Sequence, residues 1–460
     1  MNHPALAALL SCLGPDRART DDFCRALYSQ DDTPARSLPE IVLFPHSHDE
    51  VVQLVQIAAK YRLPLTPRGA GSGNVGGALP LAGGAVVSFE CMNQVLEYAP
   101  KERLIRVQSG CITAEIDQIA ASDRLCYPPD PGSSPYCRIG GNLAMNAGGP
   151  HAVKYGVTRD YVLGLKAVTG TGDTLQTGVR TSKGVVGYDL TRLLVGSEGT
   201  LALITEATLR LVPRPESRAL LRAAFRSSED ACAAVLRVMG QLQTPSAVEF
   251  MDSQSLAAVR AMGAAKDLPD GSQALLMVEV DGSTESIPVQ LAALETAIQG
   301  EGLLQLLSGQ DRTSQEALWA ARKSLSPATK AMAPLKINED VVVPVPQLPT
   351  LLAAIDEIRQ ELDLQIVSFG HAGNGNLHVN ILVDPSRAGE LERARRGLDH
   401  LFRTVLASGG TLSGEHGIGS VKRDYVALEL DPVALDLQRR IKELFDPLGI
   451  LNPGKVFPHE

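Results

Sequence analysis

Three of the nine histidines of this chain lie in two short glycine-rich stretches. The first stretch, FGHAGNGNLHVN, carries His371 and His378, and the second, SGEHGIG, carries Glu415 and His416. A tight turn between two strands can bring His371 and His378 side by side, and Glu415 from the second turn would complete a set of two imidazoles and one carboxylate. Such a set leaves coordination positions open and suits Zn²⁺, Mn²⁺ or Fe²⁺. The alternative is that each histidine is a hydrogen-bonded structural residue.

One arginine is a candidate for binding a carboxylate. Arg322 lies in LWAARK on a predicted helix. A guanidinium can hold a substrate carboxylate through two parallel hydrogen bonds. On the residues alone, however, a solvated helix charge is the favoured interpretation.

Two glycine-rich loops upstream could hold a bulky anionic cofactor. They read PRGAGSGNVGG, from Pro67 to Gly77, and PPDPGSSPYCRIGGNLAMNAGG, from Pro128 to Gly149. Glycine lets backbone N–H groups approach an anion closely, so two such loops favour a pyrophosphate with a ring system over ordinary surface turns. The letters G-x-G-x-x-G occur in the first loop, but Pro80 follows where the dinucleotide fingerprint needs a helix. An ordinary Rossmann site is therefore not expected.

The elements that would position these residues divide into two regions. In the first, strands are predicted over 41–44, 63–66, 85–90, 95–98 and 104–108, with helices over 47–61 and 113–122 and a hairpin within 161–177. After a boundary near Glu216, strands and helices alternate in pairs, as in ferredoxin-like units that form an antiparallel sheet with helices on one face.

Composition limits the class of protein. A chain of 460 residues with 44% hydrophobic residues is expected to form two or three globular domains. The net charge of −9 and the lack of a Lys/Arg-rich run argue against nucleic-acid binding. Seven scattered cysteines without a C-x-x-C pair indicate reduced thiols, with no ligand set for an iron–sulfur cluster.

Targeting signals are not evident. The N-terminal apolar run lacks a basic region before it and is predicted to be a helix rather than a signal peptide. No apolar run approaches the roughly 18 residues that span a bilayer. We expect a cytoplasmic protein, with peripheral association at the inner face of a membrane as the alternative.

Taken together and in this order, the motifs resemble those of the FAD-linked D-2-hydroxyacid dehydrogenases of the vanillyl-alcohol-oxidase superfamily. The resemblance rests on the two glycine loops, GSEGT (196–200), the two histidine stretches and NPGK (452–455), and it extends from about Pro39 to the C-terminus. It covers D-lactate dehydrogenase, the flavin subunit of glycolate oxidase and D-2-hydroxyglutarate dehydrogenase.

The resemblance implies an α+β architecture in four parts. They are an N-terminal helical segment (1–38), a PCMH-type FAD-binding domain (39–215), a substrate or cap domain with a ferredoxin-like antiparallel sheet (216–430), and a C-terminal segment that returns to the flavin domain (431–460).

The resemblance also implies which residues contact FAD. They are Arg68, Gly69, Gly71, Ser72, Gly73, Pro129, Gly140, Gly141, Asn142, Asn146, Gly148, Gly149, Glu198, Gly199 and Asn452. Relatives that bind FAD covalently have a histidine at the position of Ser72, so the cofactor is expected to be dissociable.

For the reaction itself, the resemblance implies roles that the residues alone leave open. His371, His378 and Glu415 resemble ligands of a divalent metal, Zn or Mn, and His416 resembles the proton-abstracting base. Two further residues complete the implied site: Arg322 as the substrate-carboxylate clamp and Asn380 as a contact of the substrate hydroxyl. One departure is that Asn374 replaces the more usual aspartate in the first turn, which changes the local charge but removes no ligand.

The resemblance therefore implies an FAD-dependent, metal-assisted oxidation of a D-2-hydroxyacid, with D-lactate as the first candidate. D-2-hydroxyglutarate and glycolate are alternatives within the class, and Lys323 and Lys336 are candidate partners for a second carboxylate. A flavin-binding subunit that needs a partner for activity is an alternative of another class, while few aromatic residues argue against an oxidase of phenolic alcohols. Electrons would pass to a quinone, a cytochrome, an electron-transfer flavoprotein or a partner subunit. The sequence leaves the oligomeric state open, with a homodimer as the assembly considered.

Overall fold

The computed structural model describes residues 4–263 and 265–458, and the chain forms two compact units. The first unit consists of Met1–Gly149, Val157–Arg214 and Glu415–Glu460, and the second of Pro150–Gly156 and Pro215–Gly414. The first three residues of the expected N-terminal segment (1–38) and the last two of the expected C-terminal segment (431–460) lie outside the described residues. Each unit is assembled from segments that are distant in sequence.

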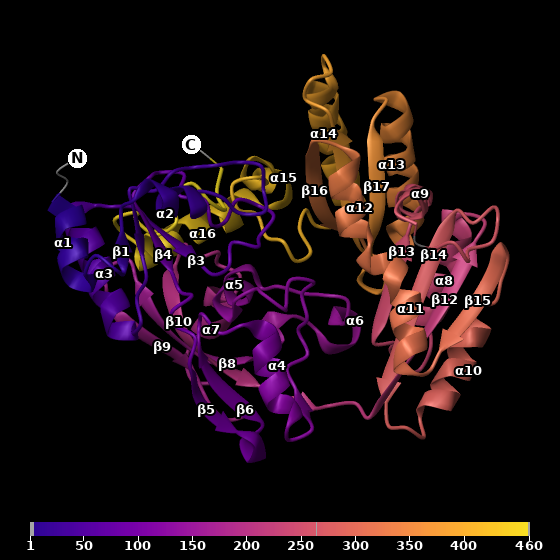
Figure 1. Ribbon diagram of the computed structural model, residues 1–460, viewed down its shortest axis with the longest axis horizontal. Coiled ribbons are helices and arrows are strands. Elements are labelled where there is room, and N and C mark those ends of the chain that lie inside the picture. The colour runs from indigo at the N-terminus through magenta and orange to yellow at the C-terminus, as the bar shows by residue number, and fades with distance from the viewer. Residues whose placement is uncertain (1–3, 264, 459–460) are drawn as a thin grey trace. The chain divides into compact units, whose positions relative to one another are not determined.

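Two main sheets form the first unit (Figure 1). In the four-stranded sheet, β2 (Ile41–Leu43) and β3 (Leu65–Arg68) flank β4 (Ala85–Ser88) in parallel, and β1 (Ala18–Arg19) adds an antiparallel edge. The five-stranded sheet is antiparallel, in the order β5 (Val95–Ala99), β6 (Leu104–Gln108), β10 (Ala202–Arg210), β8 (Val162–Thr169) and β9 (Thr174–Gly178). A third, two-stranded sheet of this unit pairs β7 (Leu125–Cys126) with β11 (Val212–Pro213).

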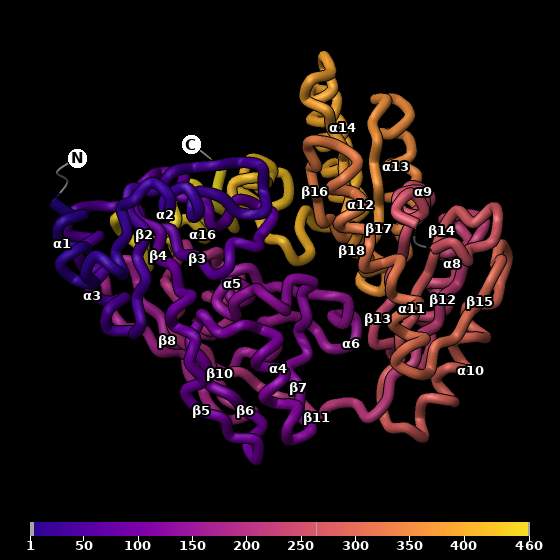
Figure 2. Tube along the Cα trace, viewed as in Figure 1, coloured from indigo at the N-terminus to yellow at the C-terminus, as the bar shows by residue number. Residues whose placement is uncertain are grey.

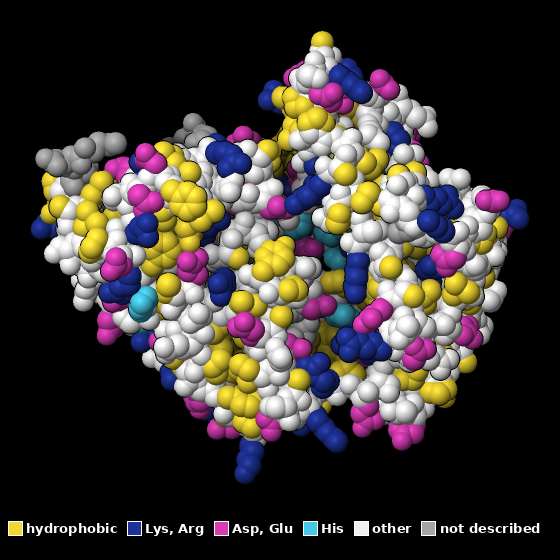
Figure 3. All heavy atoms as spheres, viewed as in Figure 1, with side chains coloured by type: hydrophobic (Ala, Val, Ile, Leu, Met, Phe, Trp, Pro, Cys, Tyr) yellow, Lys and Arg dark blue, Asp and Glu magenta, His cyan; other side chains and the backbone are white. Residues whose placement is uncertain are grey.

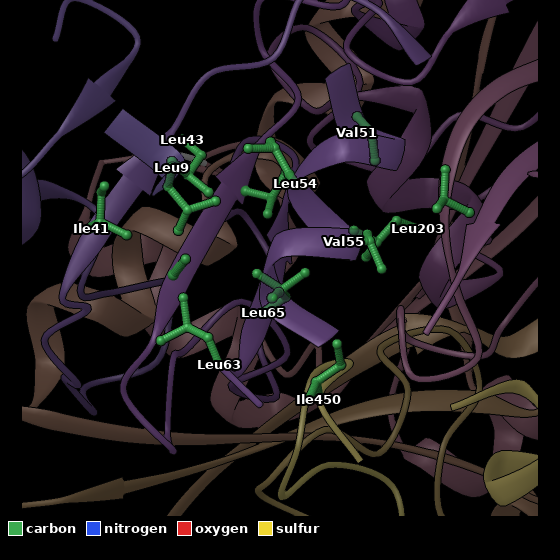
Figure 4. Close-up of a cluster of buried hydrophobic side chains, with 14 of the residues drawn as sticks. Leu9, Ile41, Leu43, Val51, Leu54, Val55, Leu63, Leu65, Leu203 and Ile450 are labelled. Atoms are coloured by element: carbon green, nitrogen blue, oxygen red, sulfur yellow. The ribbon is translucent and has the colours of Figure 1, made fainter. Parts of the chain in front are cut away.

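Helix α3 (His48–Tyr61) joins the two sheets of the first unit. Its apolar face, with Leu54 and Val55, packs against both sheets in one buried cluster that Figure 4 shows. The helix begins after Ser47, whose hydroxyl accepts a hydrogen bond from the Glu50 N–H. The His48 ring is hydrogen-bonded to Thr205 of β10 and Thr174 of β9, at 2.8 Å each, which fixes the helix on the second sheet.

Further helices surround these sheets. They are α1 (Pro4–Leu13), α2 (Asp22–Leu27), α4 (Thr113–Ala121), α5 (Ile139–Met145), α7 (Leu190–Leu194), α15 (Val426–Glu429) and α16 (Pro432–Phe445). In the described part of the chain, no helix has the length and apolar character required to cross a bilayer.

The C-terminal segment returns to the first glycine-loop strand. Leu65 donates its N–H to the Ile450 carbonyl and accepts one from the Asn452 N–H, both at 2.7 Å. Ile450 and Leu451 are buried in the same cluster as α3 (Figure 4), and Figure 2 shows the yellow end of the chain beside the indigo strands. Residues 415–430, which the sequence analysis assigns to the cap, also group with this unit, because Ser420 donates its N–H to the Val75 carbonyl at 2.9 Å.

The second unit is a seven-stranded antiparallel sheet. Its order is β15 (Leu303–Gly309), β12 (Ser217–Phe225), β14 (Ala274–Gly282), β13 (Ala247–Met251), β17 (Gln365–His371), β18 (Asn376–Val383) and β16 (Leu335–Val342). The first four strands have the 4-1-3-2 order of a ferredoxin-like unit, and the last three form a second such unit without its fourth strand. In place of that strand, Thr411 forms a single β-bridge with Val342.

Helices cover both faces of this sheet, whereas the sequence predicted helices on one face. One layer contains α8 (Ser228–Met239), α10 (Ile287–Ile298), α13 (Leu348–Glu361) and α14 (Glu390–Ala407). The other contains α9 (Ser253–Ala261), α11 (Arg312–Lys323) and α12 (Leu325–Met332), which bury the sheet residues Met251, Phe369 and Val367. Residues 150–156, with α6 (Ala152–Tyr155), belong here because Tyr155 donates its hydroxyl to Asp281 at 2.7 Å.

Candidate functional site

The first glycine loop follows β3 and leaves its backbone donors free. Within the described residues, no backbone N–H from 70 to 77 is hydrogen-bonded to a protein acceptor. A Cβ added at Gly73 or at Gly141 of α5 would meet no atom within 4 Å. Free N–H groups beside open space are what an anionic cofactor requires, so this loop fits a pyrophosphate-containing group such as FAD.

Several other glycines expected to contact FAD have a different reason to be glycine. A Cβ at Gly140 would lie 2.8 Å from the Ser109 Cβ, and one at Gly148 would lie 2.8 Å from Glu415 Oε2. At Gly71 and Gly199 the backbone has φ near +70°, where a side chain would meet Arg68 or Pro67. At these positions glycine is required by the packing of the chain itself.

The side chains of the three asparagines expected at FAD make hydrogen bonds within the protein. Asn142 donates to the Thr113 hydroxyl at 2.8 Å, and the Asn146 carbonyl oxygen accepts the Arg159 N–H at 2.9 Å. Asn452 donates to the carbonyls of Gly77 at 3.0 Å and Glu198 at 2.7 Å. Its buried Oδ1 has no partner among the described residues and remains available to a bound group.

Three further residues expected at FAD differ in exposure. Ser72 is half-buried and Pro129 is buried, and Arg68 is buried with its guanidinium over the Tyr28 ring and hydrogen-bonded to the Gln30 carbonyl at 2.5 Å. Arg68 thus lies beneath the glycine loop and supports its turn.

Glu198 holds the second histidine stretch by its backbone. Its two carboxylate oxygens accept the N–H groups of Ile418 and Gly419, each at 2.7 Å. The carboxyl is buried, and burial raises its pKa to about 7, although the two N–H groups and nearby lysines oppose the shift. The carboxylate therefore fixes the turn that carries His416.

The turn that Glu198 holds brings His416 to the first glycine loop. His416 Nε2 lies 3.5 Å from the side-chain nitrogen of Asn74, a residue that the sequence analysis did not select. The signal available for Asn74 was its place within the loop, an amide among glycines. His416 and the loop therefore belong to one compact region of the first unit.

His371 and His378 lie at facing strand ends, as the sequence predicted. His371 ends β17 and His378 lies on β18, joined by the turn Ala372–Asn374 and Gly375. Their ring centroids are 5.2 Å apart and the rings are nearly perpendicular. The side chain of Asn374 is exposed, consistent with a position that is not a ligand.

Glu415 completes the donor set through its place in the chain. It directly follows Gly414, whose N–H donates to Asp340 Oδ2 on β16 at 2.9 Å. One ligand atom from each of His371, His378 and Glu415 lies within 4.8 Å of the others. Two imidazoles and one carboxylate at this spacing have the chemistry to hold Zn²⁺ or Mn²⁺, so the residues fit a divalent metal.

The glycines around the histidine turns are required by protein packing. A Cβ at Gly370 would lie 2.5 Å from the Asn376 carbonyl, and one at Gly414 would lie 2.7 Å from the Asn376 side chain. Gly375 has φ of +72° and lies against the Val343 carbonyl. These three glycines are therefore required by the tight turns of the chain itself.

Arg322 is not a solvated helix charge. Its Nε donates to Glu249 Oε2 at 2.7 Å, its guanidinium lies 4.7 Å from the Phe369 ring centroid, and its side chain is 15% exposed. The second oxygen of Glu249 contacts Nδ1 of His371. Glu249 is fully buried, and Arg322 and His371 together occupy both oxygens of its carboxylate.

Sequence reasoning missed Glu249, although a signal was present. The residue is the one carboxylate in AVEFM, an otherwise apolar stretch that forms β13. A lone carboxylate in such a strand needs a cationic or hydrogen-bonding partner.

Strand register brings most of these side chains to one face of the sheet. Glu249 is paired with His371, Phe369 with His378, and Val367 with Asn380. Across β16, Asn338 is paired with Asn380, so their side chains share that face. The Asn380 amide nitrogen donates to the Val367 carbonyl at 3.1 Å, while its buried Oδ1 has no partner among the described residues.

Among the described residues, the face that Figure 3 shows has no large patch of side chains of one charge. Dark blue and magenta side chains alternate over both units. This distribution agrees with the absence of a Lys/Arg-rich run in the sequence.

Comparisons with known proteins agree with these features. Residues 39–178 match the family described as FAD binding domain, and residues 214–456 match FAD linked oxidases, C-terminal domain. Over 98% of this chain and 96% of the relative, the sequence is 37% identical to glycolate oxidase subunit GlcD of Bacillus subtilis (strain 168). It is 34% identical to D-lactate dehydrogenase of Anaerostipes hadrus (96% and 95% covered) and 35% identical to D-2-hydroxyglutarate dehydrogenase of Stutzerimonas stutzeri (strain A1501; 99% and 100%).

Solved structures share the fold at lower identity. The chain superposes on p-cresol methylhydroxylase with a TM-score of 0.80 at 16% identity, covering 98% of this chain and 96% of that one. For 4-ethylphenol oxidase from Gulosibacter chungangensis the TM-score is 0.79 at 20% identity, covering 99% and 97%.

Proposed function

Because the chain belongs to the FAD-linked oxidases and is an FAD-linked hydroxyacid dehydrogenase, we propose that it oxidises a D-2-hydroxyacid with the assistance of a divalent metal. D-lactate is the first candidate substrate. The observation that carries the metal part is the set of His371, His378 and Glu415, with ligand atoms within 4.8 Å of one another. The names of the relatives support the substrate class, because each acts on a small hydroxyacid.

The reaction removes a proton from the substrate hydroxyl and a hydride from the same carbon. When bound, FAD would supply the acceptor for the hydride, and a metal held by His371, His378 and Glu415 would lower the pKa of the hydroxyl. His416 accepts the hydroxyl proton, a role for which an imidazole is suited at neutral pH. It follows Glu415 in the chain, which keeps its ring close to the donor set.

Arg322 binds the substrate carboxylate through its terminal nitrogens. Its Nε–H already donates a hydrogen bond to Glu249, so the guanidinium is oriented before substrate binds. Holding a substrate in a reactive orientation can supply several kcal/mol of the barrier. Asn380 accepts a hydrogen bond from the substrate at its free Oδ1.

FAD is bound without a covalent link and electrons leave to an external acceptor. Ser72 stands where a covalent attachment would need a histidine, so denaturation with acid should release all of the flavin. The acceptor is a quinone, a cytochrome, an electron-transfer flavoprotein or a partner subunit.

D-2-hydroxyglutarate is the second candidate substrate, and one residue favours it. Lys336 lies on β16 two residues before Asn338, on the same face of the sheet, and is half-buried. A cation there could pair with the second carboxylate of that acid. Lys323, the other candidate from the sequence, has an exposed side chain.

The test is the anaerobic absorbance spectrum of the purified protein on addition of D-lactate, L-lactate, glycolate or D-2-hydroxyglutarate. We expect D-lactate to bleach the flavin band, a chelator to abolish bleaching, and Zn²⁺ or Mn²⁺ to restore it. Bleaching by D-2-hydroxyglutarate alone would transfer the assignment to the second candidate. A flavin that none of these acids reduces would favour a subunit that needs a partner.

A further inference from the structure

Glu249 is a carboxylate placed where an isolated charge would be unstable. It lies on β13, inside the seven-stranded sheet, and its side chain has no exposed surface. A buried charge requires partners of opposite charge or hydrogen-bond donors for each oxygen. Both oxygens are occupied, one by Arg322 of α11 and one by His371 of β17.

The contact with His371 selects one form of the imidazole. Because a carboxylate accepts at Nδ1, that nitrogen carries the proton and Nε2 keeps its lone pair. Cross-strand pairing of Glu249 with His371 holds the ring in this orientation. A histidine whose other nitrogen donates to a carboxylate is the usual arrangement at a protein-bound metal.

The contact with Arg322 uses Nε and leaves the two terminal nitrogens of the guanidinium free. Nε donates to Glu249 at 2.7 Å and the group lies over Phe369, while its terminal nitrogens have no hydrogen bond to any described residue. Two parallel N–H donors with a fixed direction are what a carboxylate ligand requires.

We propose that Glu249 is a positioning residue that serves both halves of the site, fixing the tautomer of His371 for the metal and the direction of Arg322 for the substrate carboxylate. This inference rests on the proposed function. Since one rigid side chain orients both groups, loss of its charge should weaken metal binding and carboxylate binding together.

The main test replaces the carboxylate by an amide of the same shape. In Glu249→Gln, we expect the affinity of metal-stripped protein for Zn²⁺, measured by competition with a chromophoric chelator, to fall roughly 10- to 100-fold. Binding of pyruvate to the metal-free protein, followed by perturbation of the flavin spectrum, should also weaken, because Arg322 loses its orientation without any involvement of the metal.

A matched control is Glu279→Gln. Glu279 is another buried carboxylate of the same sheet; it pairs with His151 at 2.8 Å and lies 3.8 Å from Arg218. Its substitution removes the same charge from the same sheet, yet Zn²⁺ and pyruvate affinities should stay at the wild-type values. Equal losses in both variants would mean a general effect on the sheet and would overturn the proposal.

A spectroscopic measurement tests the proposal on the wild-type protein. In ¹⁵N-histidine spectra of wild-type protein, with His371 assigned through His371→Gln, we expect the proton on Nδ1. A proton on Nε2 would overturn the inference. Glu249→Asp keeps the charge but is too short to reach both partners, so a variant that binds Zn²⁺ and pyruvate like wild type would also contradict it.

The two proposals fail in different ways. Wild-type protein that binds neither Zn²⁺ nor Mn²⁺ and is reduced by no 2-hydroxyacid would remove the proposed function. Wild-type protein that does both, together with an unchanged Glu249→Gln, would remove only the role of Glu249.

Discussion

At the scale of single residues, Arg322 and Arg312 of the same helix form a matched pair for substitution. Arg322→Lys keeps the charge but loses the paired N–H donors, and hydrogen bonds to charged groups contribute about 1.5–3 kcal/mol. We expect kcat/KM for the 2-hydroxyacid to fall roughly 10- to 100-fold. Arg312→Lys at the exposed start of the same helix is the control and should change nothing. Similar losses in the two variants would contradict a clamp.

His416 gives a second prediction at this scale. If it accepts the hydroxyl proton, His416→Gln should slow flavin reduction by roughly 10²- to 10⁴-fold, the usual contribution of a general base. Rapid-mixing absorbance measures that rate, while FAD content and Zn²⁺ binding should persist. His46→Gln, at an exposed histidine, is the control. Fast reduction in His416→Gln would assign the proton to another group.

At the scale of elements, Glu198 links the turn that carries His416 to pH. Burial raises the pKa of its carboxyl to about 7 in the folded chain, above an unfolded value of about 4.3. Its contribution to stability is therefore present below about pH 4 and is lost as the pH rises through about 7. We expect Glu198→Gln, which does not titrate, to gain stability relative to wild type between pH 5 and pH 8.

Thermal unfolding at a series of pH values measures this difference. Glu392→Gln, an exposed glutamate of α14, should show a constant offset from wild type over the same range. A constant offset for Glu198→Gln as well would mean that its carboxyl titrates alike in the folded and unfolded chain.

Elements also show where sequence reasoning succeeds and where it stops. The strands around the histidine turns were predicted because their apolar runs are buried on both sides. β15 was missed because it is an edge strand whose residues are mostly half-buried, which weakens the apolar pattern. The second helical layer was missed because an apolar stripe does not tell which face of a sheet it covers.

At the scale of the whole molecule, both units are discontinuous, and single-sequence patterns carry little information about such pairings. NPGK was linked to the flavin domain through resemblance, but nothing in the letters predicts that Ile450 is hydrogen-bonded to Leu65. The first unit needs its C-terminal segment for its core as well as for Asn452, whose amide bridges Gly77 and Glu198. Stability of this unit and retention of FAD should therefore depend on residues near the end of the chain.

Leu451 tests that dependence against a neighbour of the same type. Leu451 is fully buried beside α3, whereas Leu444 on α16 is 80% exposed. Leu451→Ala should lower the unfolding free energy by about 2–5 kcal/mol and speed the loss of FAD on dilution, because it leaves a cavity against β3. Leu444→Ala should change either quantity little. Denaturant unfolding and flavin fluorescence give the two readouts. If Leu451→Ala lost stability but kept FAD as tightly as wild type, the tail would serve the core of the first unit without supporting the glycine loop.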